Sequence, residues 1–281
     1  MTDGDGPNPY RGTPIVSFDT YRTLTLARDP ENARIARLTF NRPARLNAIT
    51  DETPGEIRAA VAAANACDDI HVIIVQGAGP AFCAGHDLKE LRANNYDKSY
   101  CQSLFDSCAE VMQAIIRLPK PVIAQVHGVA TAAGCQLVAS CDLAVAALDA
   151  RFATPGVNIG LFCSTPMVAL SRNVGRKAAM QMLLTGDLID APTALRFGLI
   201  NETAAPDRLA DRTLALARQL ASKSPLTLAI GKEAFYRQAE LPLAEAYAYT
   251  ARAMVGNLQA RDAQEGIGAF LDKRQPEWCG R

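Results

Sequence analysis

The chain has 281 residues, of which 49% are hydrophobic, and 29 Lys and Arg balance 29 Asp and Glu. This composition is typical of soluble globular proteins and is long enough for one large domain or two modest ones. A net charge of zero provides no positive field for a phosphate backbone or an anionic bilayer, so neither nucleic acid nor a membrane is an expected partner. The apolar runs are also far shorter than the roughly 20 residues that span a bilayer.

The first expected elements form a β-hairpin. Residues 21–28 and 33–40 are short and β-prone, and the turn residues Pro30 and Asn32 lie between them. An acidic leader rich in Gly and Pro, residues 1–14, is expected to be disordered. This leader has neither the basic start and apolar core of a signal peptide nor the Arg-rich character of a transit peptide. We therefore expect a cytoplasmic protein.

Helices and strands then alternate along the chain. Helical segments are expected over 51–67 and 98–117 and from about residue 134, and strands over 71–76, 121–126 and 142–146. The strand at 71–76 is almost continuously apolar, as expected for a strand that is buried on both faces. The alternation predicts an α/β core in which helices pack around parallel strands.

From about residue 208 the pattern changes to consecutive helices, expected over 208–222, 226–238, 243–257 and 263–273. Pro225 and Pro242 lie at two of the expected helix starts, where a missing N–H does no harm. The apolar stripes of these helices require a partner surface, either the core of the chain or another subunit.

The cysteines and histidines do not form a metal-binding pattern. Eight cysteines are scattered without a C-x-x-C pair, and the three histidines show no ligand spacing. We expect reduced, mostly buried cysteines in an intracellular protein, and no metal site.

Two Gly/Ala-rich turns, residues 77–88 and 127–137, follow two of the expected strands. Small residues let main-chain N–H groups approach a ligand, and a helix that begins there directs unpaired donors toward it. Two such turns side by side could form a two-donor oxyanion hole, although each alone is typical of a tight strand-to-helix connection. Phe82 stands where a dinucleotide-binding loop requires Gly or Ala, so a Rossmann-type site is not expected.

Several ordered motifs resemble those of the crotonase superfamily, the enoyl-CoA hydratase/isomerase fold. These motifs are Asn41–Ala48, Phe82–Leu88, Gly134–Asp142, Leu184–Asp187 with Ala191 and Ala194, Gly198–Asn201 and Glu265–Arg274. The segment 153–166 is similar to one branch, the enoyl-CoA hydratase domain-containing protein 3 group. The resemblance implies an α/β fold, a ClpP/crotonase-like spiral of ββα turns over 15–207. It also implies a helical C-terminal trimerisation region over 208–281, often within a dimer of trimers.

The resemblance further implies that the ligand is an acyl-CoA thioester, with no separate cofactor because CoA is part of the substrate. The main-chain N–H groups of His86 and Ala133 would form the oxyanion hole that stabilises an enolate.

Other positions would bind the CoA moiety. The carbonyl of Ala84 would meet the adenine amino group, and Arg45 would meet the CoA phosphates, unless it is simply a solvated surface arginine. Phe270 and Lys273 match positions that reach the adenine and the 3′-phosphate from a neighbouring subunit.

The chain departs from the family at the positions of the acid and the base. Hydratases of the family use two glutamates, which are replaced here by Gln136 and Gly156, and a third acidic position of some branches holds Ser164. A positioned general acid or base contributes roughly 10²–10⁴ in rate, and a neutral amide cannot accept a proton near neutral pH. We expect either an enzyme of fatty-acid or related acyl-CoA metabolism with weak or altered hydratase activity, or a non-catalytic acyl-CoA carrier or regulator.

Substitute chemistry would have to come from neighbouring side chains. A nucleophilic Cys135 or Cys163 would need a nearby base, for which His86 is the best placed imidazole. Buried packing is the simpler expectation for both cysteines, and Asp87 is expected to be a structural hydrogen-bond partner.

Overall fold

A six-stranded sheet forms the centre of the computed structural model, which describes residues 21–281. The expected disordered leader at residues 1–14 lies outside the described residues. The strand order is β1-β2-β3-β4-β6-β9, with bounds β1 (Leu24–Arg28), β2 (Ile35–Phe40), β3 (Val72–Gly77), β4 (Val122–Val126), β6 (Leu143–Ala147) and β9 (Glu202–Ala204). The β1–β2 pair is antiparallel and all the other pairs are parallel, so the predicted hairpin and parallel core are both confirmed.

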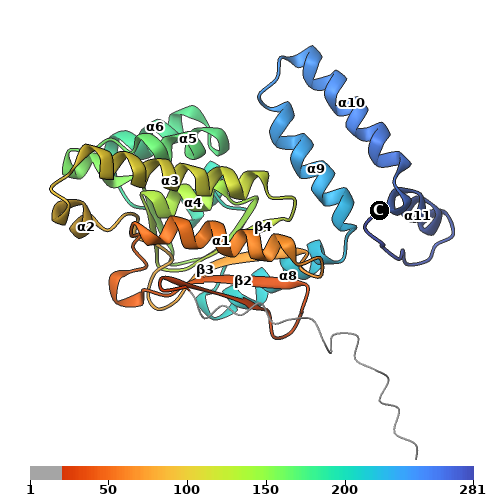
Figure 1. Ribbon diagram of the computed structural model, residues 1–281, viewed down its shortest axis with the longest axis horizontal. Coiled ribbons are helices and arrows are strands. Elements are labelled where there is room, and N and C mark those ends of the chain that lie inside the picture. Colours follow the sequence, from red (N-terminus) through yellow and green to blue (C-terminus); the bar gives the residue numbers. More distant parts are fainter. Residues whose placement is uncertain (1–20) are drawn as a thin grey trace, which may run out of the picture.

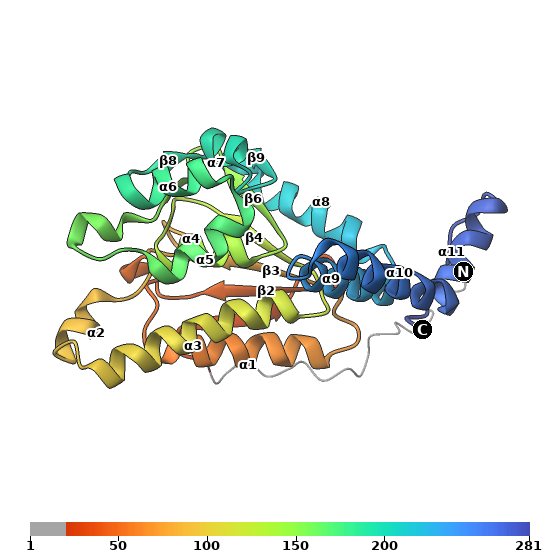
Figure 2. The same cartoon turned by 90° about the horizontal axis from the view of Figure 1, so that it is seen from above.

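Helices cover both faces of this sheet. On one face lie α1 (Glu52–Ala66) and α3 (Lys98–Arg117), and α8 (Leu209–Ala221) packs across the strands on the other (Figure 2). The side chains of Val72, Ile73 and Ile74 in β3 are therefore completely buried. This arrangement confirms the expectation that the apolar run at 71–76 is a strand covered on both faces.

A second, three-stranded sheet continues the main strands. It contains β5 (Val129–Thr131), β7 (Arg151–Ala153) and β8 (Ile189–Asp190), and β5 pairs parallel with β7. The chain passes from β4 to β5 to α4 (Ala133–Ser140), and from β6 to β7 to α5 (Ser164–Asn173). These ββα turns are the units of the crotonase spiral, and the fold class predicted from the sequence is confirmed.

Short elements complete the core. They are the helices α2 (Leu88–Ala93), α6 (Arg176–Thr185) and α7 (Ala191–Phe197) and the 3₁₀ turns η1 (Pro43–Arg45), η2 (Pro155–Ile159) and η3 (Pro206–Arg208). None of the helices within residues 21–281 has the length and apolar character needed to cross a membrane.

The last three helices form an arm that projects away from the core (Figure 1). The arm consists of α9 (Pro225–Gln238), α10 (Leu243–Gln259) and α11 (Arg261–Leu271). Because α8 packs on the sheet, the chain leaves the core at α9, one helix later than the boundary expected at residue 208. The α9 helix buries none of its residues, and α10 buries only Ala246.

A partly buried ion pair joins this arm to the core. The Nζ of Lys232 in α9 donates hydrogen bonds to Asp142 Oδ2 (2.6 Å) and to the main-chain carbonyls of Ile115 and Lys120 (3.0 Å each). The hydroxyl of Tyr236, one turn later, donates to Asp142 Oδ1 at 3.0 Å. All three donor positions of the ammonium group face oxygen atoms of the core, so the base of the arm has a defined position.

Candidate active site

The two Gly/Ala-rich turns lie side by side. Cys83 forms a parallel bridge with Ala130, in which Cys83 N donates to Val129 O (3.1 Å) and Thr131 N donates to Cys83 O (3.0 Å). The burial of Cys83 and Ala130 is complete. Strand pairing therefore brings together two turns that are separated by about fifty residues of sequence.

The tips of the turns come into contact at a glycine. Gly85 has a φ of +90°, and a Cβ atom built on it would lie 2.9 Å from Ala132 Cβ and 3.4 Å from Ala133 N. A side chain at this position would separate the two turns. Only glycine combines this backbone conformation with such a close approach.

Each of these turns carries an unpaired main-chain N–H group. The bridge between Ile49 and His86 uses Gly85 O and Asp87 N (2.8 Å each), so the N–H of His86 faces the opposite side, and it has no main-chain acceptor among residues 21–281. Ala133 is the first residue of α4, where the N–H has no acceptor within the helix. Two free donors on contacting turns are the parts that the predicted oxyanion hole requires.

Ala132 stores backbone strain at the start of α4. Its φ of 50° and ψ of −117° are unusual for a residue with a side chain, and its N–H donates to Ala153 O at 2.9 Å. Strained residues persist only when the surrounding structure holds them. Here α4 is buried along its whole length, which fixes the position of Gln136 one turn further on.

Asn47 supports the first turn through hydrogen bonds of its side chain to distant segments. Its side chain accepts from Arg42 N (2.9 Å) and donates to Ala78 O (2.9 Å) and Ala81 O (2.7 Å). The Asn-Ala that ends the Asn41–Ala48 motif is the only signal in the sequence that could have pointed to it. The buried amide thus ties the β2 exit to the β3 exit.

The expected CoA-binding residues fall into two groups. Arg45 is exposed and lies beside Ala84, because Leu46 O accepts a hydrogen bond from Ala84 N at 3.0 Å. The carbonyl of Ala84 also accepts from Thr131 Oγ1 at 3.0 Å, which leaves one lone pair for a ligand. Phe270, which is 82% exposed, belongs to α11, and Lys273 follows this helix. The helix α11 lies away from the core that carries the two turns (Figure 1).

The three positions of the family's acidic residues are not equivalent in the structure. Gln136 is 4% exposed, and its Oε1 is enclosed without a hydrogen-bond partner in the described part of the chain. Gly156 is also buried, and its N–H donates to Cys163 Sγ at 3.3 Å. Ser164 differs from the other two because it is exposed, and its hydroxyl donates to Phe162 O at 3.4 Å within its own loop.

The loop after β7 packs tightly around Gly156. A Cβ atom at this position would lie 2.4 Å from Leu161 O and 2.9 Å from Cys163 Sγ. A glutamate could therefore not be accommodated without moving the loop. The position differs from a glutamate site in its backbone as well as in its missing carboxylate.

Burial favours the uncharged forms of the His86 imidazole and of the Cys135 and Cys163 thiols. The imidazole of His86 packs edge-on against Phe105 with ring centroids 5.2 Å apart, its Nε2 is enclosed, and burial lowers its pKa to about 4. Burial raises the pKa of the Cys135 thiol to about 12 and also raises the pKa of Cys163. Neither thiol has the low pKa that a nucleophilic cysteine requires.

The remaining polar groups have structural roles. Asp87 caps α2 by accepting a hydrogen bond from Lys89 N at 3.1 Å, and it faces Arg42 at 3.6 Å. All eight cysteines are free thiols, and five of them are buried. Within residues 21–281 no three His, Cys, Asp or Glu side chains are grouped to hold a metal ion.

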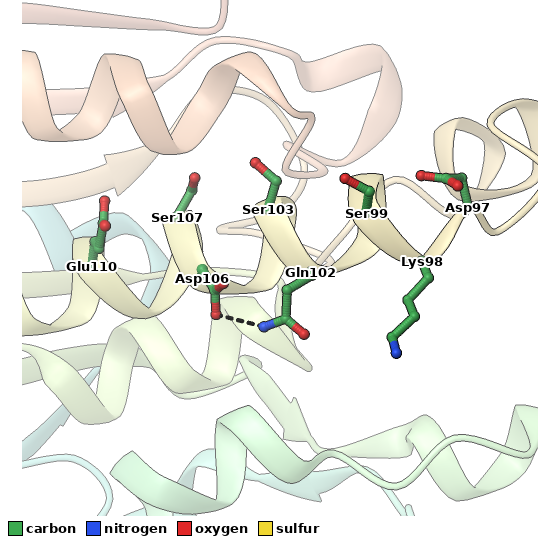
Figure 3. Close-up of a pocket in the computed structure, with 8 residues that line it drawn as sticks. All are labelled: Asp97, Lys98, Ser99, Gln102, Ser103, Asp106, Ser107 and Glu110. Atoms are coloured by element: carbon green, nitrogen blue, oxygen red, sulfur yellow. Dashed lines mark hydrogen bonds between the residues drawn. The ribbon is translucent and has the colours of Figure 1, made fainter.

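A groove on the surface lies along α3, away from the two turns. It is lined by Asp97 and by polar side chains of α3 alone, including Ser103, Asp106 and Glu110 (Figure 3). Gln102 and Asp106 are hydrogen-bonded to each other along this helix at 2.9 Å. None of the predicted site residues lines the groove, so it carries no candidate site.

A spiral of ββα turns with two unpaired N–H groups on contacting turns defines a protein of the crotonase class. Residues 30–281 match the family model described as enoyl-CoA hydratase/isomerase, and the chain belongs to this family.

Named relatives agree with this assignment. The chain is 46% identical over 256 residues to the mitochondrial enoyl-CoA hydratase domain-containing protein 3 of Danio rerio, covering 91% of this chain and 88% of that protein. The protein of the same name from Homo sapiens is 46% identical over 253 residues, covering 89% and 83%. The predicted resemblance to this branch is confirmed.

Solved structures show the same relationship. The crystal structure of an enoyl-CoA hydratase from Mycobacterium smegmatis is 48% identical, with a TM-score of 0.88 and coverage of 92% of this chain and 99% of that chain. The human enoyl-CoA hydratase domain-containing protein 3 is 44% identical, with a TM-score of 0.87 and coverage of 92% and 100%.

The expected cytoplasmic location is wrong. The relatives from Danio rerio and Homo sapiens carry names that place them in mitochondria. A soluble composition and reduced cysteines fit a mitochondrial protein equally well, so they do not distinguish the two compartments. The leader on which the expectation also depended lies outside the described residues.

Proposed function

We propose that the protein binds an acyl-CoA thioester and polarises its carbonyl group with the N–H groups of His86 and Ala133. The observation that carries the proposal is the contact between the two turns at Gly85, which leaves both donors unpaired. Donors that are fixed before the ligand arrives stabilise a developing oxyanion without reorganisation. CoA is part of the ligand in this proposal, and no further cofactor is required.

The same site is poorly equipped for hydration. Gln136 and Gly156 cannot exchange a proton, and Cys135 is held in its protonated form by burial. Each missing acid or base removes roughly 10²–10⁴ in rate, and the two losses are not independent. We therefore propose a member of the family with weak or altered turnover of 2-enoyl-CoA.

A non-catalytic acyl-CoA carrier or regulator is the second candidate. The closed loop around Gly156 favours it, because this loop leaves no space for a second carboxylate. Such a protein would retain the binding turns and the CoA contacts without carrying out a reaction.

Binding and turnover measured in parallel test both candidates. Calorimetry with crotonyl-CoA and butyryl-CoA measures affinity, and the loss of the enoyl absorbance measures hydration. Binding with hydration at least about 10²-fold slower than that of a hydratase that has both glutamates supports the enzyme. Binding with no turnover supports the carrier, and failure to bind either thioester rejects the proposal.

We also propose that the arm mediates self-association, as a trimer or a dimer of trimers. Large apolar side chains on α10 and α11 are exposed in the single chain, including Leu243 (75%), Tyr247 (71%), Met254 (71%) and Phe270 (82%). Apolar surface of this extent on a soluble protein is typical of an interface. A neighbouring copy would then bring Phe270 and Lys273 to the CoA moiety.

A further inference from the structure

Lys232 of the arm contacts the C-terminal ends of two helices of the core. Its Nζ donates to the main-chain carbonyl of Ile115, in the last turn of α3, at 3.0 Å. It also donates to Asp142 Oδ2 at 2.6 Å, and Asp142 follows Cys141, the residue that caps the end of α4. The side chains of Lys232 and Asp142 are only 7% and 15% exposed. Hydrogen bonds that are mostly enclosed by protein are stronger than the same bonds in water, so this junction is a firm one.

The same two helices carry or contact the two proposed donors of the oxyanion hole. Ala133 is the first residue of α4, so this helix has one donor at its start and leads into Asp142 at its end. Phe105 of α3 packs edge-on against the imidazole of His86, whose main-chain N–H is the other donor. Through one ammonium group, the arm therefore holds the ends of both helices that bear on the positions of the donors.

The helix α4 is suited to pass a displacement from one end to the other. It has eight residues, all of them buried, and at 1.5 Å per residue such a helix is about 12 Å long. Its last turn is closed by the bond from Cys141 N to Leu137 O (3.1 Å), and Val122 N donates to Asp142 Oδ2 at 2.7 Å. Close-packed interiors transmit strain because they leave no free space in which a shift could be absorbed. A displacement of Asp142 would therefore move Ala133 as well.

We propose that Lys232 is a positioning residue of the acyl-thioester site, and that its docking on Asp142 and Ile115 sets the spacing of the two donors. The inference rests on the proposed acyl-CoA binding. It gives the arm a role within its own chain, in addition to contacts with a neighbouring copy. Both donors must reach one oxygen atom, so a small change in the distance between them lengthens at least one of the two hydrogen bonds.

The infrared stretch of the bound carbonyl reports directly on the two donors. Hydrogen bonds polarise the C=O bond, so butyryl-CoA that is isotopically labelled at this carbon should absorb at a lower frequency on the wild type than in solution. The double variant Asp142→Asn with Lys232→Met removes both charges together, so that neither is left buried without its partner. We expect it to lose part of this frequency shift and to bind butyryl-CoA about three- to tenfold more weakly by calorimetry.

Tyr236→Phe provides a milder change at the same place. It removes only the hydroxyl that donates to Asp142 Oδ1 at 3.0 Å and leaves the ion pair intact. We expect a smaller loss of the frequency shift in the same direction. This variant tests the proposal even where the double variant fails to fold.

Lys120→Met is the matched control. The Nζ of Lys120 donates to the main-chain carbonyls of Ala64, Asn65 and Cys67 at 2.8, 3.0 and 2.6 Å. These atoms lie at the end of α1, a helix that carries neither donor. The substitution leaves the main-chain carbonyl of Lys120, which accepts a bond from Lys232, in place. We expect a lower melting temperature, with the carbonyl frequency and the affinity for butyryl-CoA unchanged.

The carbonyl frequency decides the outcome. The wild-type frequency in both the double variant and Tyr236→Phe would overturn the inference. A lower affinity with that same frequency would assign the junction to the CoA contacts alone and overturn it too. A loss of the frequency shift in Lys120→Met as large as in the double variant would indicate general loosening of the core, with the same consequence. Failure of the wild type to bind butyryl-CoA, or to shift its carbonyl frequency, would instead overturn the proposed function, and this inference with it.

Discussion

Gly85 joins the two turns because it has no side chain, and this makes it the most direct test of the binding site. Gly85→Ala would place a Cβ 2.9 Å from Ala132 Cβ at a φ of +90° and push the turns apart. We expect at least tenfold weaker acyl-CoA binding by calorimetry, and a free energy of unfolding lower by about 1–3 kcal/mol in urea titrations.

The control for this change is Gly198→Ala. Gly198 has a similar φ of +85°, but the nearest atom to an added Cβ is Asn173 O at 3.6 Å. The variant carries the cost of the left-handed backbone without the contact between the turns, so its acyl-CoA affinity should stay unchanged. Equal losses of affinity in the two variants would contradict the proposed arrangement of the turns.

His86 gives the protein a defined dependence of stability on pH. Burial lowers its pKa to about 4 in the folded state, against about 6.5 in an unfolded chain. Between these values the unfolded state binds more protons, so stability is complete above pH 6.5 and falls as the pH approaches 4. We expect His86 to account for a loss of about 2 kcal/mol in the free energy of unfolding between pH 7.5 and pH 5.

Denaturant titrations of wild type and His86→Phe at the two pH values measure this contribution. The phenyl ring preserves the edge-on packing against Phe105 and keeps the main-chain N–H, but it cannot be protonated. The variant should lose about 2 kcal/mol less than the wild type on acidification. An equal decrease in the free energy of unfolding in both proteins would show that a group other than His86 causes the loss of stability at acidic pH.

The role of a residue could be predicted from the sequence where the residue belongs to a local motif. It could not be predicted where the role depends on a partner far away in the sequence. The turn motifs placed His86 and Ala133 on turns that the structure brings into contact. The supporting bonds of Asn47 to Ala78 and Ala81 cross more than thirty residues. Such contacts depend on the pairing of whole strands, which a local pattern does not contain.

At the scale of elements, the length of a helix or strand determined whether its bounds could be predicted from the sequence. The helix expected over 98–117 has those bounds in the structure, because twenty residues define a helical period clearly. The strands β5, β7 and β8 have two or three residues each and show no period at all. The strand β5 nevertheless lies within the second turn, and β7 leads into the loop at Gly156, so the local geometry of these parts of the site could not be derived from periodicity.

The space around Gly156, in the loop after β7, determines which substitutions this loop can accept. Gly156→Ala would place a Cβ 2.4 Å from Leu161 O, and we expect the free energy of unfolding to fall by about 1–3 kcal/mol. Gly55→Ala in α1 is the matched control, because an added Cβ there meets nothing within 4 Å. Replacing a glycine inside a helix should stabilise the protein by about 0.5–1 kcal/mol.

The lack of space for a side chain at Gly156 also determines what happens when glutamates are introduced at positions 136 and 156. Gln136→Glu with Gly156→Glu would introduce two acids, but the second would displace the loop that holds Cys163. We expect the double variant to be less stable than Gln136→Glu alone and to gain no hydratase activity. A folded double variant that hydrates crotonyl-CoA would show that the loop opens more readily than its packing indicates.

At the scale of the whole molecule, the core and the arm differ in how they bury apolar surface. The core encloses its strands between helices, and the pair formed by Lys232 and Asp142 attaches the arm to it. The face of α10 that carries Tyr247, Met254 and Leu258 has no partner among residues 21–281. A sequence pattern shows the apolar stripe but not its partner, which is why the oligomeric state could not be predicted from periodicity.

Disrupting this face tests whether a neighbouring copy completes the CoA site. Met254→Glu places a charge on the apolar face, whereas Arg252→Glu changes a charge on the other side of α10, away from Tyr247 and Met254. Light scattering after gel filtration should give a monomer for Met254→Glu and the wild-type mass for Arg252→Glu. Because Phe270 and Lys273 would then be missing from the CoA moiety, Met254→Glu should bind acyl-CoA at least tenfold more weakly. Its affinity for an acyl thioester of N-acetylcysteamine, which lacks the nucleotide, should stay unchanged. A monomer that retains full acyl-CoA affinity would assign the CoA contacts to a single chain.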